Sequence, residues 1–185
     1  AVYFVASSGL TLIFGLMRVI TLAHGTSFLF GGYLGYVVAV ATDNWILGLL
    51  AGLLAAGLLG LFTHQVLIRR FQDDDMRVAL ITLGVAVIGT DLMLAVFGGT
   101  ATQVPFPQNL QVAVDLPGIG DYPLIRLIIL AIAIVLGLAI YFIIAKTRFG
   151  SIVRAGVDDA PMTSATGVNV RVVFAVIFAV GSALA

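Results

Sequence analysis

Two residues that could do chemistry stand close together in an otherwise apolar region, in the stretch RVITLAHGTSF (residues 18–28). Arg18 and His24 can both carry a proton and donate hydrogen bonds. His24 could form a structural hydrogen bond between helices, contact a substrate, or relay protons if an acid lies nearby. The sequence has one other His, His64, and no Cys, and neither His has a partner at ligand spacing. We therefore expect no metal site.

A carboxylate stands inside another apolar stretch. Asp91 lies within the run from about residue 78 to residue 98. Ionisable side chains inside a membrane normally face a cavity or a partner group. Asp91 could therefore bind the ammonium group of a substrate, or pair with Arg18 or His24. Thr82 and Thr90 on the same run are weaker candidates, and they project about 80° apart around a helix.

The composition indicates that these residues belong to an integral membrane protein. Hydrophobic residues make up 61% of the 185 residues and charged residues only 10%, whereas soluble domains carry roughly 25% charged residues. The mean hydropathy is +1.17. No basic stripe predicts nucleic-acid binding. Because both ends lie in apolar runs, we expect the chain to be a fragment truncated at both ends.

Apolar runs long enough to cross a bilayer recur along the chain, since a spanning helix needs about 20 residues. The predicted spans are residues 1–17, 24–42, 46–68, 78–98, 124–145 and 172 to the end. We therefore predict an all-α polytopic membrane protein, with about six transmembrane segments in a single domain over residues 1–185. A helix break is predicted near residues 18–27, with Gly25 giving backbone freedom and Thr26 and Ser27 acting as local caps.

Basic residues are confined to alternate connections. Three Arg lie in 69–77, and Lys146, Arg148, Arg154 and Arg171 lie in 146–171, so these two loops hold seven of the nine basic residues. The positive-inside rule places both in the cytoplasm. It places the tight turn at 42–45 and the proline-containing loop 99–123 on the other side. In that outer loop the alternation of Val112, Val114 and Leu116 is typical of a strand or hairpin.

The second cytoplasmic loop has the signals of a short, capped helix in VDDAPMTSATGVN (residues 157–169). Asp158 or Asp159 can cap its start, Pro161 is tolerated in a first turn, and Gly167 suits the position after its end. Such a helix could be a surface that another protein grips, or it could simply lie at the membrane interface.

Two stretches of the chain resemble one family. KTRFGSIVRAGVDDAPMTSATGVN is similar to the coupling loop of the branched-chain amino-acid ABC transporter permeases, part of the hydrophobic amino-acid and amide uptake group. GLTLIFGLMRVITLAHG is similar to the same family's earlier motif, with Thr21 where the family has Asn. The matching positions of the loop are Thr147, Arg148, Gly150, Arg154, Ala155, Asp158, Asp159, Gly167, Val168 and Asn169.

The resemblance implies a permease subunit of an ABC importer in a prokaryotic inner membrane. Its 158–167 helix would dock on ABC ATPase subunits through Arg148, Gly150, Arg154, Asp158, Asp159 and Gly167. His24, Gly25 and Thr26 would lie at the translocation path, where Thr82 and Asp91 are further candidates. The implied partners are the ATPases, a second homologous or identical permease, an extracytoplasmic substrate-binding protein, the small-molecule cargo and membrane lipid.

The sequence leaves the cargo and one rival mechanism open. The cargo could be a branched-chain or other hydrophobic amino acid, or urea, a short amide or, less favoured, a pentose. A channel or secondary transporter that needs no ATPase is the alternative of a different class. No enzyme motif is present, and the only Lys, Lys146, is not in a phosphate-binding loop. We therefore expect no cofactor on this chain and ATP hydrolysis on separate subunits.

Overall fold

The computed structural model describes residues 1–17, 21–71, 74–99, 113–116 and 120–185. Helices dominate this part of the chain. They are α1 (Val2–Met17), α2 (His24–Thr42), α3 (Trp45–Phe62), α4 (Asp75–Phe97), α5 (Leu124–Lys146), α6 (Arg148–Asp158), α7 (Ala160–Ala165) and α8 (Val170–Ala183). A π-helical turn (Thr63–Leu67) and a 3₁₀ turn (Ile68–Arg70) prolong α3.

Six apolar helices occupy the six predicted spans. Four helical stretches in the described chain are long and apolar enough to cross a membrane, namely His24–Thr42, Trp45–Arg70, Met76–Phe97 and Leu124–Lys146. The other two, α1 and α8, are apolar but shorter. The prediction of an all-α polytopic membrane protein is confirmed, and so is a break between α1 and α2.

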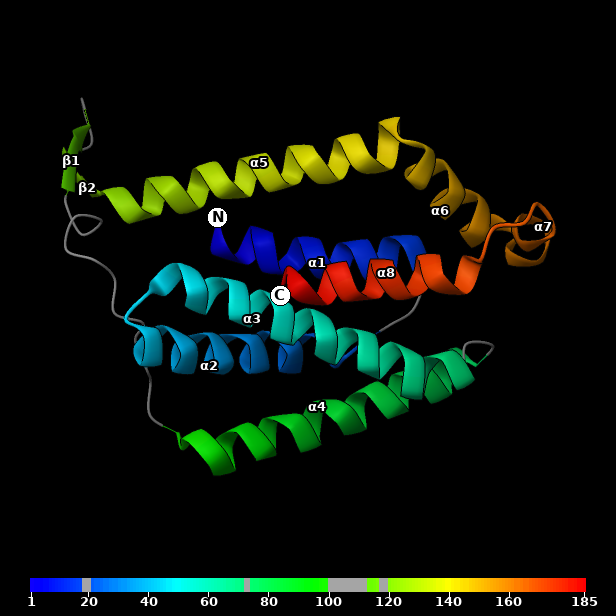
Figure 1. The fold of residues 1–185 in the computed structure, drawn as a ribbon, viewed down its shortest axis with the longest axis horizontal. Coiled ribbons are helices and arrows are strands. Elements are labelled where there is room, and N and C mark those ends of the chain that lie inside the picture. The colour runs from blue at the N-terminus through cyan, green and yellow to red at the C-terminus, as the bar shows by residue number, and fades with distance from the viewer. Residues whose placement is uncertain (18–20, 72–73, 100–112, 117–119) are drawn as a thin grey trace.

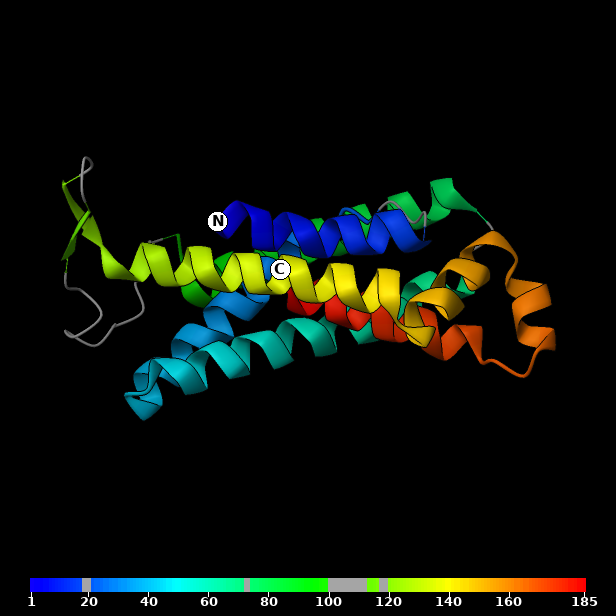
Figure 2. The ribbon, with the colours of Figure 1, turned by 90° about the horizontal axis from the view of Figure 1, so that it is seen from above.

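The long helices lie side by side (Figures 1 and 2). Helix α3 packs against α2 and α8, α1 packs against α8 and α5, and α4 packs against α2. Both termini lie within the length of the bundle, with the N-terminus nearer to the end that carries the two strands (Figure 1). We call the end that carries α6 and α7 the basic end, and the opposite end, with the two strands, the hairpin end.

Glycines allow α2 and α3 to approach each other closely. A methyl group on the α-carbon of Gly52 would lie 2.6 Å from the carbonyl oxygen of Gly31, and one on Gly35 would lie 2.9 Å from that of Gly48. Small residues serve this purpose in membranes because lipid gives apolar helices no hydrophobic reason to associate, so close backbone packing must do so.

Near the basic end, two clusters of buried apolar side chains tie the helices together. Ile13, Ile68, Val78 and Phe178 form the first. Leu12, Val153 and Ile177 form the second, and through Val153 it fixes α6 to α1 and α8.

Two connections fold as the sequence predicts. In the outer loop, β1 (Ala113–Leu116) pairs antiparallel with β2 (Gly120–Pro123), placing Val114 opposite Tyr122. Val112 lies outside the described residues. The tight turn before α3 uses Asp43 in the left-handed region (φ 49°), and the Asn44 side chain caps α3. The sides of the membrane assigned to the loops stay predictions.

Candidate functional site

Three of the polar residues singled out in the sequence meet where α1 gives way to α2. The first is His24, the first residue of α2, whose Nε2 lies 2.9 Å from the Ala6 carbonyl oxygen of α1. A carbonyl only accepts hydrogen bonds, so Nε2 carries the proton and donates. Nδ1 is then an acceptor, and it is buried without a hydrogen-bond partner among the described residues. His24 therefore joins α1 to α2.

Helix α4 holds the start of α2 through two threonines. The Thr26 hydroxyl donates to the Ala86 carbonyl oxygen at 3.3 Å. The buried Thr82 hydroxyl accepts from the Leu22 N–H at 3.2 Å and donates to the Ala79 carbonyl oxygen at 3.0 Å. Both side chains thus attach the junction between α1 and α2 to helix α4.

The local details predicted for the break are wrong. Gly25, Thr26 and Ser27 are helical residues of α2, and the glycines with positive φ in the described chain are Gly98 and Gly167. The cap position of α2 is Ala23, and no side chain caps it. Thr26 does not cap because its hydroxyl finds a carbonyl on α4, a tertiary contact that the local sequence does not encode. Arg18 lies outside the described residues.

Asp91 is separate from this junction. It is nine residues from Thr82, so the two side chains project from opposite sides of α4, about 180° apart. Asp91 is exposed, as is Thr90, and it has no hydrogen bond or ion pair among the described residues. The structure brings His24, Thr26 and Thr82 together and leaves Asp91 on the other side of the helix.

His64 was considered from the sequence as a metal ligand, but its burial was not predicted. His64, in the π-helical turn after α3, is 1% exposed, and its ring centroid lies 5.4 Å from that of Phe178. Its position in an apolar run was the only available signal. Among the described residues, no three His, Cys, Asp or Glu side chains gather as a possible metal site.

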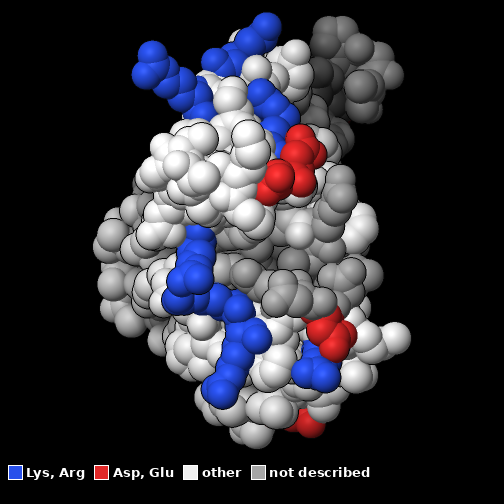
Figure 3. All heavy atoms as spheres, turned by 90° about the vertical axis from the view of Figure 1, so that its right-hand side faces the viewer, with Lys and Arg blue, Asp and Glu red and all other residues white. Residues whose placement is uncertain are grey.

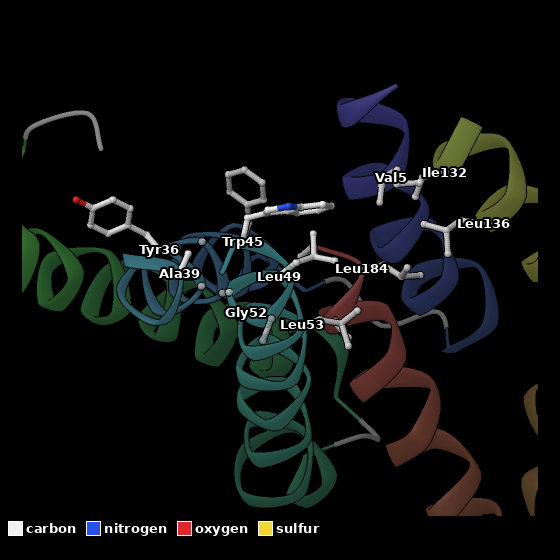
Figure 4. A pocket seen from close by; sticks show the side chains of 18 residues that line it. Val5, Tyr36, Ala39, Trp45, Leu49, Gly52, Leu53, Ile132, Leu136 and Leu184 are labelled. Atoms are coloured by element: carbon white, nitrogen blue, oxygen red, sulfur yellow. The ribbon is translucent and has the colours of Figure 1, made fainter. Parts of the chain in front are cut away.

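An apolar pocket of about 500 Å³ opens between α2 and α3 on one side and α1, α5 and α8 on the other (Figure 4). Gly52 and Leu53 line one wall, Ile132 and Leu136 the other, and Trp45 also borders it. None of the polar residues predicted to contact a substrate lines this pocket. Its walls suit apolar groups and offer few polar atoms to orient one.

The second candidate region is the short helix α7 at the basic end. Asp159 Oδ1 accepts from the Met162 N–H at 2.8 Å, Pro161 is in the first turn, and Gly167 follows the end of the helix at φ +88°. The predicted capped helix is confirmed, with Asp159 as its cap. Asp158 instead ends α6 and is exposed.

Helix α6 was not predicted. Thr147 caps it by accepting from the Gly150 N–H at 3.2 Å, while Gly150 and Val153 are buried. A methyl group on Gly150 would lie 2.0 Å from the Ile144 carbonyl oxygen, to which the Arg154 guanidinium donates. The spacing of apolar and small residues over 150–157 was the signal for an amphipathic helix.

Exposed charges surround α6 and α7. Arg148, Arg154 and Asp159 are all exposed. Figure 3 views the molecule from the basic end and shows Lys and Arg side chains over much of this face, with acidic side chains among them. On α7, Thr163 is buried whereas Met162 is 70% exposed. The helix therefore presents an apolar side chain outward from a charged surface.

Comparison with known proteins gives a family match over the whole chain. A family model described as "Branched-chain amino acid transport system / permease component" matches residues 1–185. The chain is 24% identical over 195 residues to the "High-affinity branched-chain amino acid transport system permease protein LivH" of Salmonella typhimurium, and equally to that of Escherichia coli. In both cases the match covers 99% of this chain and 63% of the relative.

A third relative gives a similar result. The chain is 23% identical over 197 residues to the "High-affinity branched-chain amino acid transport system permease protein BraD" of Pseudomonas aeruginosa, covering 99% of this chain and 64% of that protein. The chain thus spans a little under two-thirds of the length of these curated relatives. No solved structure matches it.

Proposed function

The chain belongs to the family of permease components of branched-chain amino acid transport systems, and we propose that it is the membrane-spanning subunit of an ABC importer. The cargo would be a branched-chain or other hydrophobic amino acid, carried across a prokaryotic inner membrane. The observation that carries this proposal is α7, a short helix capped at both ends that stands out from the basic end of the bundle.

The distribution of Lys and Arg supports one orientation of the chain in the membrane. Four basic residues lie on α6 or on the ends of the helices next to α6 and α7: Lys146, Arg148, Arg154 and Arg171. Arg69 and Arg70 lie in the 3₁₀ turn after α3, and Arg77 lies in the first turn of α4. Cytoplasmic loops of membrane proteins carry an excess of Lys and Arg. The basic end then faces the cytoplasm, where ATPases reside, and the hairpin end faces the substrate-binding protein.

Docking would place α7 in a groove of an ATPase subunit. The outward Met162 offers the groove an apolar contact, and the inward Thr163 packs α7 back onto the permease. The residues proposed to form or support this coupling surface are Arg148, Gly150, Arg154, Asp158, Asp159 and Gly167. ATP would bind only to the ATPases, and this chain would need no cofactor of its own.

The substrate path and the second permease subunit are also proposals. His24, Gly25 and Thr26 lie at the helix break, which in a transporter can border the path. Thr82 and Asp91 are on the neighbouring helix α4. One alternative is the same machine with urea, a short amide or, less favoured, a pentose as cargo. The other is an ATP-independent channel or secondary transporter.

The test is transport by the full-length protein reconstituted with its partner subunits in liposomes. Uptake of leucine, urea and ribose is measured side by side, with and without ATP and the substrate-binding protein. We expect leucine uptake that needs both. Uptake of urea or ribose alone would show that the cargo is not an amino acid. Flux without ATP would contradict the proposal of an ABC importer.

A further inference from the structure

One side of α4 is exposed along much of its length. Leu80 and Val87 are 61% and 55% exposed, and Gly84 and Asp91 are exposed as well. Gly84 and Asp91 are seven residues apart and therefore project within about 20° of each other around the helix. A methyl group on Gly84 would meet no atom within 4 Å. We call Leu80, Gly84, Val87 and Asp91 the open face of α4.

The opposite side of α4 is packed against α2. Thr82 is fully buried there, and a methyl group on Gly89 would lie 2.2 Å from Thr26 Cγ2. Met93 continues this side and is 8% exposed. The packed side fixes how α4 is rotated, so the open face must look away from the described bundle.

Asp91 lies within the candidate membrane-spanning stretch Met76–Phe97, in the third of α4 nearest the hairpin end. It is six residues before the helix ends at Phe97, about 9 Å along the axis. The hairpin end of α4 also stops short of the turn that joins α2 and α3 (Figure 1). A carboxylate in contact with lipid at such a depth is unfavourable, and intramembrane carboxylates normally face a water-filled cavity or a partner group.

We propose that the open face of α4 lines a water-filled path through the membrane, and that Asp91 binds a primary ammonium group there. This inference rests on the proposed function, in which the cargo is an amino acid and the second permease subunit supplies the opposite wall. A carboxylate accepts charge-assisted hydrogen bonds from an ammonium group, and these are the stronger kind. Of the residues proposed above for the substrate path, Asp91 then contacts the cargo, whereas His24, Thr26 and Thr82 position α2 and α4 from the opposite side of α4.

The path is tested by water access. These 185 residues have no Cys. Single cysteines are placed at Gly84 and Val87, and their labelling is compared with that of the transporter without either substitution. Leu138 is the matched control, because it is 53% exposed but lies on α5. The assembled transporter is treated in liposomes with a charged, water-soluble thiol reagent. We expect labelling at positions 84 and 87 and none at 138. Equal absence of labelling at all three positions would overturn the path.

The ammonium site is tested by two substitutions at Asp91. We expect Asp91→Asn to reduce leucine uptake about tenfold or more, as for the loss of a charged hydrogen bond, and Asp91→Glu to retain most of it. Thr42→Val, which removes an exposed hydroxyl from α2, is the control. Unchanged leucine uptake by Asp91→Asn would overturn the ammonium site. If the unaltered transporter fails to import leucine, the proposed function fails instead, while the labelling still tests the path.

Discussion

Gly9 of α1 and Gly181 of α8 touch where their helices cross. A methyl group on Gly9 would lie 2.2 Å from the Gly181 carbonyl oxygen, and one on Gly181 would lie 2.9 Å from that of Gly9. The would-be methyl group on Gly9 would also lie 3.1 Å from the His24 ring. This crossing therefore brings α1, α8 and the first residue of α2 to one point.

Adding one methyl group at this crossing should destabilise the bundle. We expect Gly9→Ala to lower its stability by about 1–3 kcal/mol, because the clash is with backbone that can yield only if a helix moves. Gly15→Ala on the same helix is the control, since nothing lies within 4 Å of its methyl group. Thermal unfolding in detergent measures both. Equal melting temperatures would show that the crossing is looser than described.

The Thr82 hydroxyl should matter for stability more than its size implies. Thr82→Val keeps the shape of the side chain but leaves the Leu22 N–H without its acceptor. Because this hydrogen bond is only partly buried, its loss should cost about 0.5–1.5 kcal/mol. Thr90→Val removes an exposed hydroxyl of the same helix and should change the melting temperature little. If the two variants have the same melting temperature, the hydrogen bond from the Leu22 N–H to Thr82 does not stabilise the contact between α4 and the start of α2.

Replacing His24 separates a structural role from a role in transport. His24→Ala removes the bond to the Ala6 carbonyl oxygen, and interhelical hydrogen bonds in membranes contribute about 0.5–1.5 kcal/mol. We expect a modest fall in melting temperature with leucine uptake reduced but present. Loss of uptake at an unchanged melting temperature would instead assign His24 to the substrate path.

Adjacent acids at the start of α7 should behave differently. Asp159 caps the helix and Asp158 does not. Asp159→Ala should destabilise α7 by about 0.5–2 kcal/mol and lower the leucine transported per ATP hydrolysed, because docking needs a formed helix. Asp158→Ala keeps the cap and should retain more of this ratio. The two rates are measured together in liposomes, and equal ratios would contradict the docking role of α7.

Features set by local sequence or by membrane thickness could be predicted. The span boundaries follow from apolar runs about as long as a bilayer is thick. The caps of α7 follow from Asp159, Pro161 and Gly167, whose backbone and side-chain preferences act within a few residues. The strand at 113–116 could likewise be predicted, from the alternation of apolar residues within a few positions.

Features set by contacts distant in sequence could not be predicted. Thr26 was expected to cap its own helix, but its hydroxyl bonds to Ala86, sixty residues away. The rotation of α4, which buries Thr82 and exposes Asp91, is fixed by packing against α2. The apolar spacing over 150–157 was a local signal for helix α6. Its placement depends on the burial of Val153 against α1 and α8, which is a contact between residues distant in sequence.

The position of α7 has a mechanical consequence. Its two ends return to different helices, to α5 through α6 and to α8 through Asn169. These helices are anchored unequally: Ala133 is the one buried residue recorded on α5, whereas α8 buries six, including Ile177 and Phe178. A force applied to α7 along the bundle axis would therefore act on both helices, on α5, which has little buried surface, and on α8, which is packed firmly into the bundle. Its main effect would be to tilt α5 relative to α8.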